Sequence, residues 1–246
     1  IWDDQYGWAR ERSNNKKGPK PDNFFDLVRK GDLVTLSNSE SHQRIIQIPP
    51  AEAAFVSMNP KNGHIKTYIG GTNFLKTKFD RVRQSFPQTG SSFKPFIYAS
   101  AISRGYDASS LINDAPIIFE DENLEDYWRP ENYTKKFYGL TRLREALVQS
   151  INIVSIKLLR NIGVENVRND LQAFGFDKRR LPSDLSLALG SSSFSPIEMT
   201  RAFSILVNEG KAQEPVYITK VEDRNGNIIY EHQSLNDDEA KDCLLY

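Results

Sequence analysis

The sequence has 246 residues, and its 32 lysines and arginines balance 32 aspartates and glutamates, so the formal net charge is zero. This length is enough for one large domain or two modest ones, each able to bury a core. The charge balance gives no reason to expect a nucleic-acid partner, and one cysteine with three scattered histidines predicts neither a metal site nor another cofactor.

The chain contains no run of 18 apolar residues, and no charged-then-apolar leader precedes a small-residue cleavage site. The printed sequence is therefore expected to be soluble. It opens on Ile1-Trp2 and closes on Leu244-Leu245-Tyr246 without a cap. We interpret it as a fragment whose targeting segments lie outside it.

Strand patterns dominate the first part of the chain. The residues up to about Asp22 are polar and predict a loop or linker. Apolar and β-branched residues then predict a small four-stranded sheet, with a turn at Asn59-Pro60-Lys61-Asn62-Gly63. Its strands are expected over residues 33–36, 44–48, 53–58 and 64–69.

Helix patterns begin at Gly90, and helices are expected over residues 91–103, 141–150, 153–162 and 164–174. Ser195-Pro196-Ile197-Glu198 combines an N-cap serine, a first-turn proline and a capping-box glutamate, and predicts a further helix towards Gly210. Residues 216–222 and 228–232 flank Arg224-Asn225-Gly226-Asn227, which predicts a hairpin. Residues 234–246 are acidic and without pattern, so we expect a disordered or truncated tail.

One short segment places a hydroxyl and an amine on the same side of a helix. Ser91 and Lys94 are three residues apart, and Pro95 prevents the helix from beginning much before Ser91. Free N–H groups at a helix N-terminus favour negative charge that develops near the serine. The pair is typical of an acylating serine with its base, although an N-cap serine and a solvated lysine would give the same pattern.

A second polar pair lies between two predicted helices. Ser150-Ile151-Asn152 joins the helix ending near Ser150 to the helix starting near Ile153. Side chains at such a break can point outward together and complete a site. Local capping of the second helix is the alternative explanation.

Several runs in this chain, taken in order, resemble the transpeptidase domain of class A penicillin-binding proteins of the 1A type. The S-x-x-K, S-x-N and K-T-G elements characterise this superfamily. The resemblance extends from about Phe24 to His232. The runs that carry it are Arg83 to Tyr98, Trp128-Arg129-Pro130-Glu131-Asn132-Tyr133, Tyr138 to Leu147, and Ser186-Leu187-Ala188-Leu189-Gly190-Ser191.

The resemblance implies an α+β penicillin-binding/serine β-lactamase-like fold, in part only, with a helical part packed on an antiparallel sheet. Residues 1–50 would be a linker and a remnant of a small β (OB-like) domain. Residues 51–233 would be a partial transpeptidase domain.

The resemblance also implies the roles of four residues. Ser91 would be the nucleophile that forms an acyl-enzyme, and its backbone N–H would be one oxyanion donor. Lys94 would take the serine proton, Ser150 would relay it to the leaving amine, and Asn152 would bind the substrate amide. A free lysine is neutral at pH 7 only about a few times in ten thousand, so Lys94 must be buried to act as this base.

The sequence departs from the family pattern in one place, because neither Lys-Thr-Gly nor Lys-Ser-Gly follows Ser150. Lys66-Thr67-Tyr68 precedes the serine and lacks the glycine. In the family the third element binds the substrate carboxylate, on the strand that supplies the second oxyanion donor. Losing one oxyanion donor typically costs about 10²- to 10³-fold in rate, so the 246 residues alone are expected to be poorly active.

The leading interpretation is a D,D-transpeptidase that cross-links peptidoglycan stem peptides and is acylated by β-lactam antibiotics. The full-length protein is expected to be anchored in the bacterial inner membrane, facing the periplasm, with an N-terminal glycosyltransferase domain. Two alternatives stay open. A β-lactamase-like hydrolase would need a glutamate to hold water, for which Glu165 follows Ser150 too closely. A non-catalytic sensor or scaffold could use the same fold.

Overall fold

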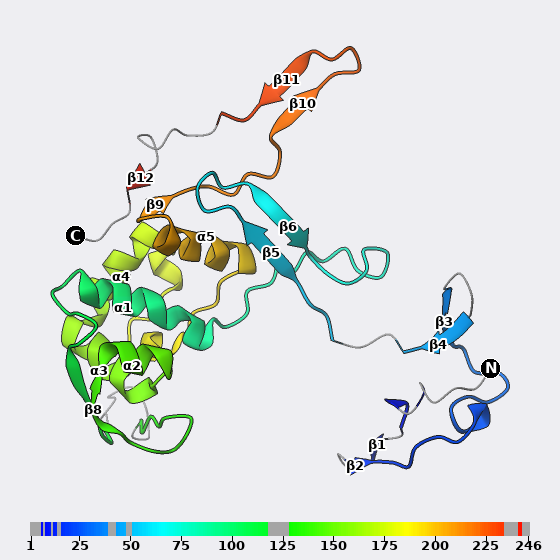
Figure 1. The fold of residues 1–246 in the computed structure, drawn as a ribbon, viewed down its shortest axis with the longest axis horizontal. Helices are drawn as coiled ribbons and strands as arrows, with labels where there is room; N and C mark the ends of the chain where they lie inside the picture. Colours follow the sequence, from blue (N-terminus) through cyan, green and yellow to red (C-terminus); the bar gives the residue numbers. More distant parts are fainter. Residues whose placement is uncertain are drawn as a thin grey trace. The chain divides into compact units, whose positions relative to one another are not determined.

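A computed structural model of the chain describes residues 6, 8–10, 12–13, 16–38, 43–47, 51–117, 128–233 and 241–242. The chain divides into two compact units, Ile1–Ala51 and Glu52–Tyr246. Helices together with small antiparallel sheets give an α+β architecture (Figure 1). Residues 234–240 and 243–246 of the expected tail fall outside the described residues.

The first unit contains two short hairpins. β1 (Arg12–Ser13) pairs with β2 (Lys16–Lys17), and β3 (Thr35–Asn38) pairs with β4 (Gln43–Ile46), both antiparallel. Between them the 3-10 helix η2 (Phe24–Asp26) is held by a capping box from Asn23.

The prediction of one four-stranded sheet is wrong. β5 (Phe55–Met58) and β6 (Ile65–Ile69) form a separate antiparallel hairpin in the second unit, joined by the expected turn after Met58. Pro49 and Pro50 lie in the sequence between β4 and β5, and proline cannot donate to a strand ladder. Strand patterns alone could not reveal which strands pair.

Three more two-stranded sheets complete the second unit. β7 (Leu111–Asp114) pairs with β8 (Gly139–Arg142), and the expected hairpin forms from β10 (Lys220–Glu222) and β11 (Ile228–Glu231). β9 (Lys211–Ala212) pairs with β12 (Lys241–Asp242). Two residues of the predicted tail therefore pair with a strand of the fold.

The helices follow the predicted order, with shifted boundaries. The prediction of helix at Thr141 and Arg142 is wrong because both belong to β8, and the expected 164–174 helix becomes 3-10 after Asp170. The α-helices are α1 (Lys94–Ile102), α2 (Leu143–Val148), α3 (Asn152–Ile162), α4 (Val164–Asp170) and α5 (Pro196–Val207). The 3-10 helices of this unit are η3 (Gly90–Phe93), η4 (Leu171–Phe174), η5 (Lys178–Arg180) and η6 (Leu185–Leu189).

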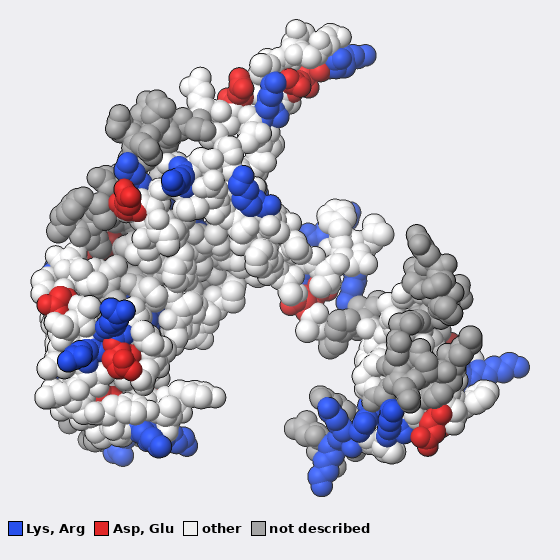
Figure 2. Space-filling view, in the orientation of Figure 1, with Lys and Arg blue, Asp and Glu red and all other residues white. Residues whose placement is uncertain are grey.

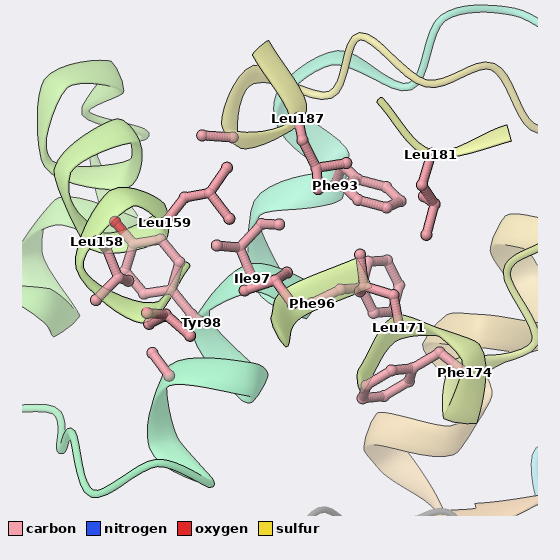
Figure 3. Close-up of a cluster of buried hydrophobic side chains, with 14 of the residues drawn as sticks. Phe93, Phe96, Ile97, Tyr98, Leu158, Leu159, Leu171, Phe174, Leu181 and Leu187 are labelled. Atoms are coloured by element: carbon pink, nitrogen blue, oxygen red, sulfur yellow. The ribbon is translucent and has the colours of Figure 1, made fainter. Parts of the chain in front are cut away.

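The core of the second unit lies around α1 and α3, which pack against each other (Figure 1). Phe93, Phe96 and Ile97 point from η3 and α1 into it and are fully buried (Figure 3). A hydrogen bond of 3.1 Å between the hydroxyls of Tyr98 and Ser155 also joins α1 to α3. Packing on several faces therefore fixes where α1 begins.

Helix α5 confirms the most specific local prediction. The Ser195 hydroxyl accepts from the Glu198 N–H, and the Glu198 carboxylate accepts from the Ser195 N–H, which is the expected capping box. α5 packs on β5, so this part of the helical layer covers the β5–β6 hairpin. Within the described ranges no helix is long and apolar enough to span a membrane.

Candidate active site

The Ser91–Lys94 segment forms a tight turn at the start of α1. Ser91 lies in η3, where its carbonyl accepts from the Lys94 N–H, and α1 continues from Lys94. Ser91 is exposed, whereas Lys94 is completely buried. The predicted helix start is thus confirmed in position, but its first turn is 3-10 rather than α-helical.

A neighbouring strand-like segment holds the approach to Ser91. The N–H of Thr89 donates to the Ser192 carbonyl and that of Gly90 to the Gly190 carbonyl, both at 2.9 Å. A Cβ at Gly190 would lie 1.9 Å from the Gly90 oxygen. Only glycine permits this close approach of the two backbones.

The second expected element lies at a sharp break between α2 and α3. Ser150 has a φ of 54°, which is uncommon outside glycine, and α3 starts two residues later. The Ser150 N–H donates to the Leu147 carbonyl, and the Ile151 N–H donates to the Ala146 carbonyl. These bonds turn the chain so that Ser150 stays exposed at the break.

Lys94 joins the two elements directly. Its Nζ donates to the Ser150 carbonyl at 2.7 Å, to the Ser150 Oγ at 3.0 Å and to the Asn152 Oδ1 at 2.8 Å. Burial lowers the pKa of Lys94 to about 8. At pH 7 about one lysine in ten would then be neutral, so an amine base is accessible near neutrality.

The Asn152 side chain is held from a third segment. Its Nδ2 donates to the Glu131 carbonyl at 3.0 Å, which leaves Oδ1 facing Lys94. The Asn152 and Ile153 N–H groups donate to the Asn132 Oδ1 at 3.0 and 3.1 Å. Residues 131 and 132 thus contact the site, although the sequence analysis gave them no role beyond the run 128–133.

The structure brings Lys94, Ser150 and Asn152 into hydrogen-bond contact and keeps Ser91 one turn from Lys94. A buried amine, an exposed hydroxyl and an amide therefore lie together, and the exposed Ser91 precedes the amine by three residues. This arrangement can support nucleophilic attack by a serine, with proton transfer through the lysine and the second serine.

Glu165 lies at the other end of α3 from Asn152. The helix has 11 residues, which corresponds to a rise of about 16 Å. Hydrogen bonds from Lys178 and Arg168 hold the pKa of the Glu165 carboxyl below its usual value. A carboxylate paired in this way is unsuited to hold a reactive water beside Ser150.

Among the described residues, no three histidine, cysteine, aspartate or glutamate side chains lie close enough together to hold a metal ion.

Comparison with known proteins agrees with the geometry. The family profile described as penicillin binding protein transpeptidase domain matches residues 53–242. Penicillin-binding protein 1A of Pseudomonas aeruginosa is 42% identical over 233 residues, and that of Escherichia coli is 36% identical over 225. The matches cover 94% and 91% of this chain but 28% and 26% of those relatives.

Solved structures show the same fold. The crystal structure of penicillin-binding protein 1A from Haemophilus influenzae aligns with a TM-score of 0.80 at 36% identity, and covers 85% of this chain and 31% of its own. PonA1 of Mycobacterium tuberculosis aligns with a TM-score of 0.66 at 24% identity, over 79% of this chain and 54% of its own. The chain thus spans less than a third of the length of its 1A relatives.

Proposed function

The chain belongs to the penicillin-binding protein transpeptidase domain family, and we propose that it contributes the acyl-transfer site of a serine D,D-transpeptidase that cross-links peptidoglycan stem peptides. The observation that carries the proposal is the contact of the buried Lys94 amine with Ser150 and Asn152, one turn from the exposed Ser91. The fold class is that of the family, as the resemblance implied.

In the proposed reaction, neutral Lys94 accepts the proton of Ser91 while the serine oxygen attacks the carbonyl carbon of a terminal D-Ala-D-Ala peptide bond. The backbone N–H of Ser91, in the first turn of η3, stabilises the oxyanion. The C–N bond then breaks, and Ser150 passes the proton from Lys94 to the departing amine. Attack by an acceptor amine on the ester reverses these proton transfers and releases the cross-linked product.

Asn152 would accept from or donate to the peptide amide of the substrate. Its Oδ1 accepts from Lys94 and its Nδ2 donates to the Glu131 carbonyl, so the orientation of the amide is fixed before substrate binds. A preorganised polar group does not have to be reoriented during the reaction.

β-Lactam antibiotics are proposed as acylating ligands of Ser91. A solved complex of Mycobacterium tuberculosis PonA1 contains penicillin V, and that protein shares the fold at 23% identity. For the full-length protein we propose a periplasm-facing location, an inner-membrane anchor and an N-terminal glycosyltransferase domain, as the family resemblance implies. Residues 1–50 are proposed to be a linker and a remnant of a small β domain.

The test is to locate the penicillin adduct by mass spectrometry in the product of the longest open reading frame that contains this sequence. We expect one adduct per protein on Ser91 and none in Ser91→Ala. Ser92→Ala is the matched control, because Ser92 is also exposed and its hydroxyl donates to the Thr89 carbonyl. An adduct that persists in Ser91→Ala, or lies on another residue, would refute the proposal.

Two further measurements test the β-lactamase interpretation and the importance of the third motif. Rapid hydrolytic turnover of penicillin would favour a β-lactamase, whereas the position and pairing of Glu165 support a stable acyl-enzyme. If the longer product contains the third motif, which the 246 residues lack, we expect the 246 residues alone to be labelled at least about 10²-fold more slowly than that product. Equally fast labelling would show that this motif is dispensable.

A further inference from the structure

We propose that Asn132 is a positioning residue of the site, which acts through Asn152 and the first turn of α3. The inference rests on the proposed function of Lys94 and Asn152. The Asn132 side chain makes its hydrogen bonds with other residues than Ser91 and Lys94. Asn132 is only 4% exposed and lies between the end of β7 and the start of α3.

The surroundings of Asn132 leave its amide one orientation. Its Nδ2 donates at 2.9 Å to both carboxylate oxygens of Asp114 and to the Lys136 carbonyl. These three partners can only accept, so the nitrogen has to face them. Asp114 is itself completely buried and also accepts from the Tyr138 N–H at 2.9 Å, so its carboxylate is fixed in turn.

The opposite edge of the same amide caps α3. Helix α3 has Ile151 at its N-cap, which offers no side-chain acceptor. The Asn132 Oδ1 supplies that acceptor from another segment and receives the N–H groups of Asn152 and Ile153. A capping side chain of this kind stabilises a helix by about 1 kcal/mol when it comes from the N-cap residue itself.

Two of the hydrogen bonds that residues 131 and 132 make with α3 involve Asn152. Asn132 fixes its main chain, and the adjacent Glu131 carbonyl fixes its side-chain amide, so Oδ1 points to Lys94. Residues 131 and 132 therefore help to shield the Lys94 amine from water. Removing the Asn132 amide should weaken these contacts and let water reach Lys94.

The test measures the titration of Lys94 in the 246-residue chain, by NMR of ¹³C-dimethylated lysines. Because burial is what lowers this pKa, we expect Asn132→Ala to raise it by about one unit towards its ordinary value. Asn166→Ala is the matched control, since the Asn166 Nδ2 donates to the Ile162 carbonyl at the far end of α3. It should weaken the same helix and leave the titration of Lys94 unchanged.

A second measurement tests whether Asn132 acts through Asn152. In the longest open reading frame, we expect Asn132→Ala to slow penicillin acylation about tenfold, and to have little further effect when Asn152 is already alanine. A purely structural role predicts equal effects in both backgrounds. If Asn132→Ala does not fold, Asp114→Asn keeps the shape and removes one acceptor of the Asn132 amide, and a smaller rise of the Lys94 pKa is expected.

An unchanged Lys94 titration in folded Asn132→Ala, or acylation equal to that of Asn166→Ala, would overturn the proposal. The Lys94 titration can be measured whether or not the protein reacts with penicillin. Lack of penicillin labelling in the unmodified protein would refute the acyl-transfer proposal even if the Lys94 pKa responds to Asn132.

Discussion

Lys94 is a buried cation whose charge is opposed by burial and supported by three oxygen acceptors. Burial outweighs the three acceptors and lowers the pKa of Lys94 to about 8, so the fraction of neutral amine near pH 7 is far larger than in a free lysine. A lysine in this condition can both accept and return a proton near neutral pH, which is what alternating acylation and deacylation require.

The pH dependence of acylation follows from this pKa. In the proposed mechanism the reactive form of Lys94 is the neutral amine, whose fraction falls as pH falls through about 8. We expect the rate of penicillin acylation to rise about tenfold from pH 6 to pH 7 and to level off above about pH 9. Stopped-flow measurements in the longest open reading frame would check this, and a flat profile from pH 6 to 9 would contradict it.

The backbone of Ser150 offers a second test at the residue level. Its φ of 54° is unfavourable for any residue except glycine, so Ser150→Gly is expected to stabilise the fold by about 1 kcal/mol. The same change removes the proposed relay and should reduce acylation at least about 10²-fold.

Urea unfolding and penicillin labelling measure the two effects separately. Ser150→Ala serves as the comparison, because it removes the hydroxyl and keeps the backbone unfavourable. Retained acylation in Ser150→Gly would exclude the hydroxyl from the reaction.

At the level of elements, the site depends on the pairing of residues 88–90 with residues 190–193. Gly190→Ala would place a Cβ against the Gly90 oxygen, so the two segments would have to separate. We expect a much larger loss of thermal stability than the roughly 1 kcal/mol of backbone strain alone, together with loss of Ser91 labelling.

Gly105→Ala is the control for this prediction. Gly105 has a φ of 89° and nothing within 4 Å of the added Cβ, so only backbone strain is introduced. Equal melting temperatures for Gly190→Ala and Gly105→Ala would show that the close approach of the Gly90 and Gly190 backbones does not contribute to stability.

Local signals explain what could be predicted from the sequence. The capping box of α5 and the Ser91–Lys94 spacing each depend on neighbouring residues, and both appear in the structure. Ser150 and Asn152 were also identified as one element. Their chemical roles remain predictions, because only their positions are determined.

Contacts between distant segments explain what the sequence did not reveal. Thr141 and Arg142 pair with β7, about thirty residues earlier, and this pairing overrides their helical pattern. The β3–β4 and β5–β6 hairpins have similar strand patterns but do not pair with each other. An asparagine in a loop, such as Asn132, gives no signal in the sequence. Its contacts with Asp114 and Asn152 join segments that are distant in the sequence and form only on folding.

On the scale of the whole molecule, the second unit contains all the candidate site residues. We expect a chain reduced to Glu52–Tyr246 to unfold cooperatively and to keep the Lys94 titration of the full 246 residues. Calorimetry and lysine NMR would check this. A chain that unfolds without a transition, or a Lys94 that titrates near 10.4, would show that the unit Ile1–Ala51 is needed.

In the second unit, positive and negative side chains are interspersed on the face shown in Figure 2. Ion pairs join Glu165 to Arg168, Asp177 to Arg179 and Glu214 to Arg201. Exposed pairs of this kind add little stability, so the unit depends mainly on its apolar core.

Phe93 lies between Ser91 and Lys94 in sequence and packs against the ring of Phe96 (Figure 3). It also packs against the rings of Phe176 and Phe194. The turn that carries Ser91 is therefore built into the hydrophobic core instead of lying on a loosely packed loop. We therefore expect penicillin binding to be lost at the same temperature at which the whole domain melts. At no lower temperature should the protein remain folded and yet fail to bind penicillin.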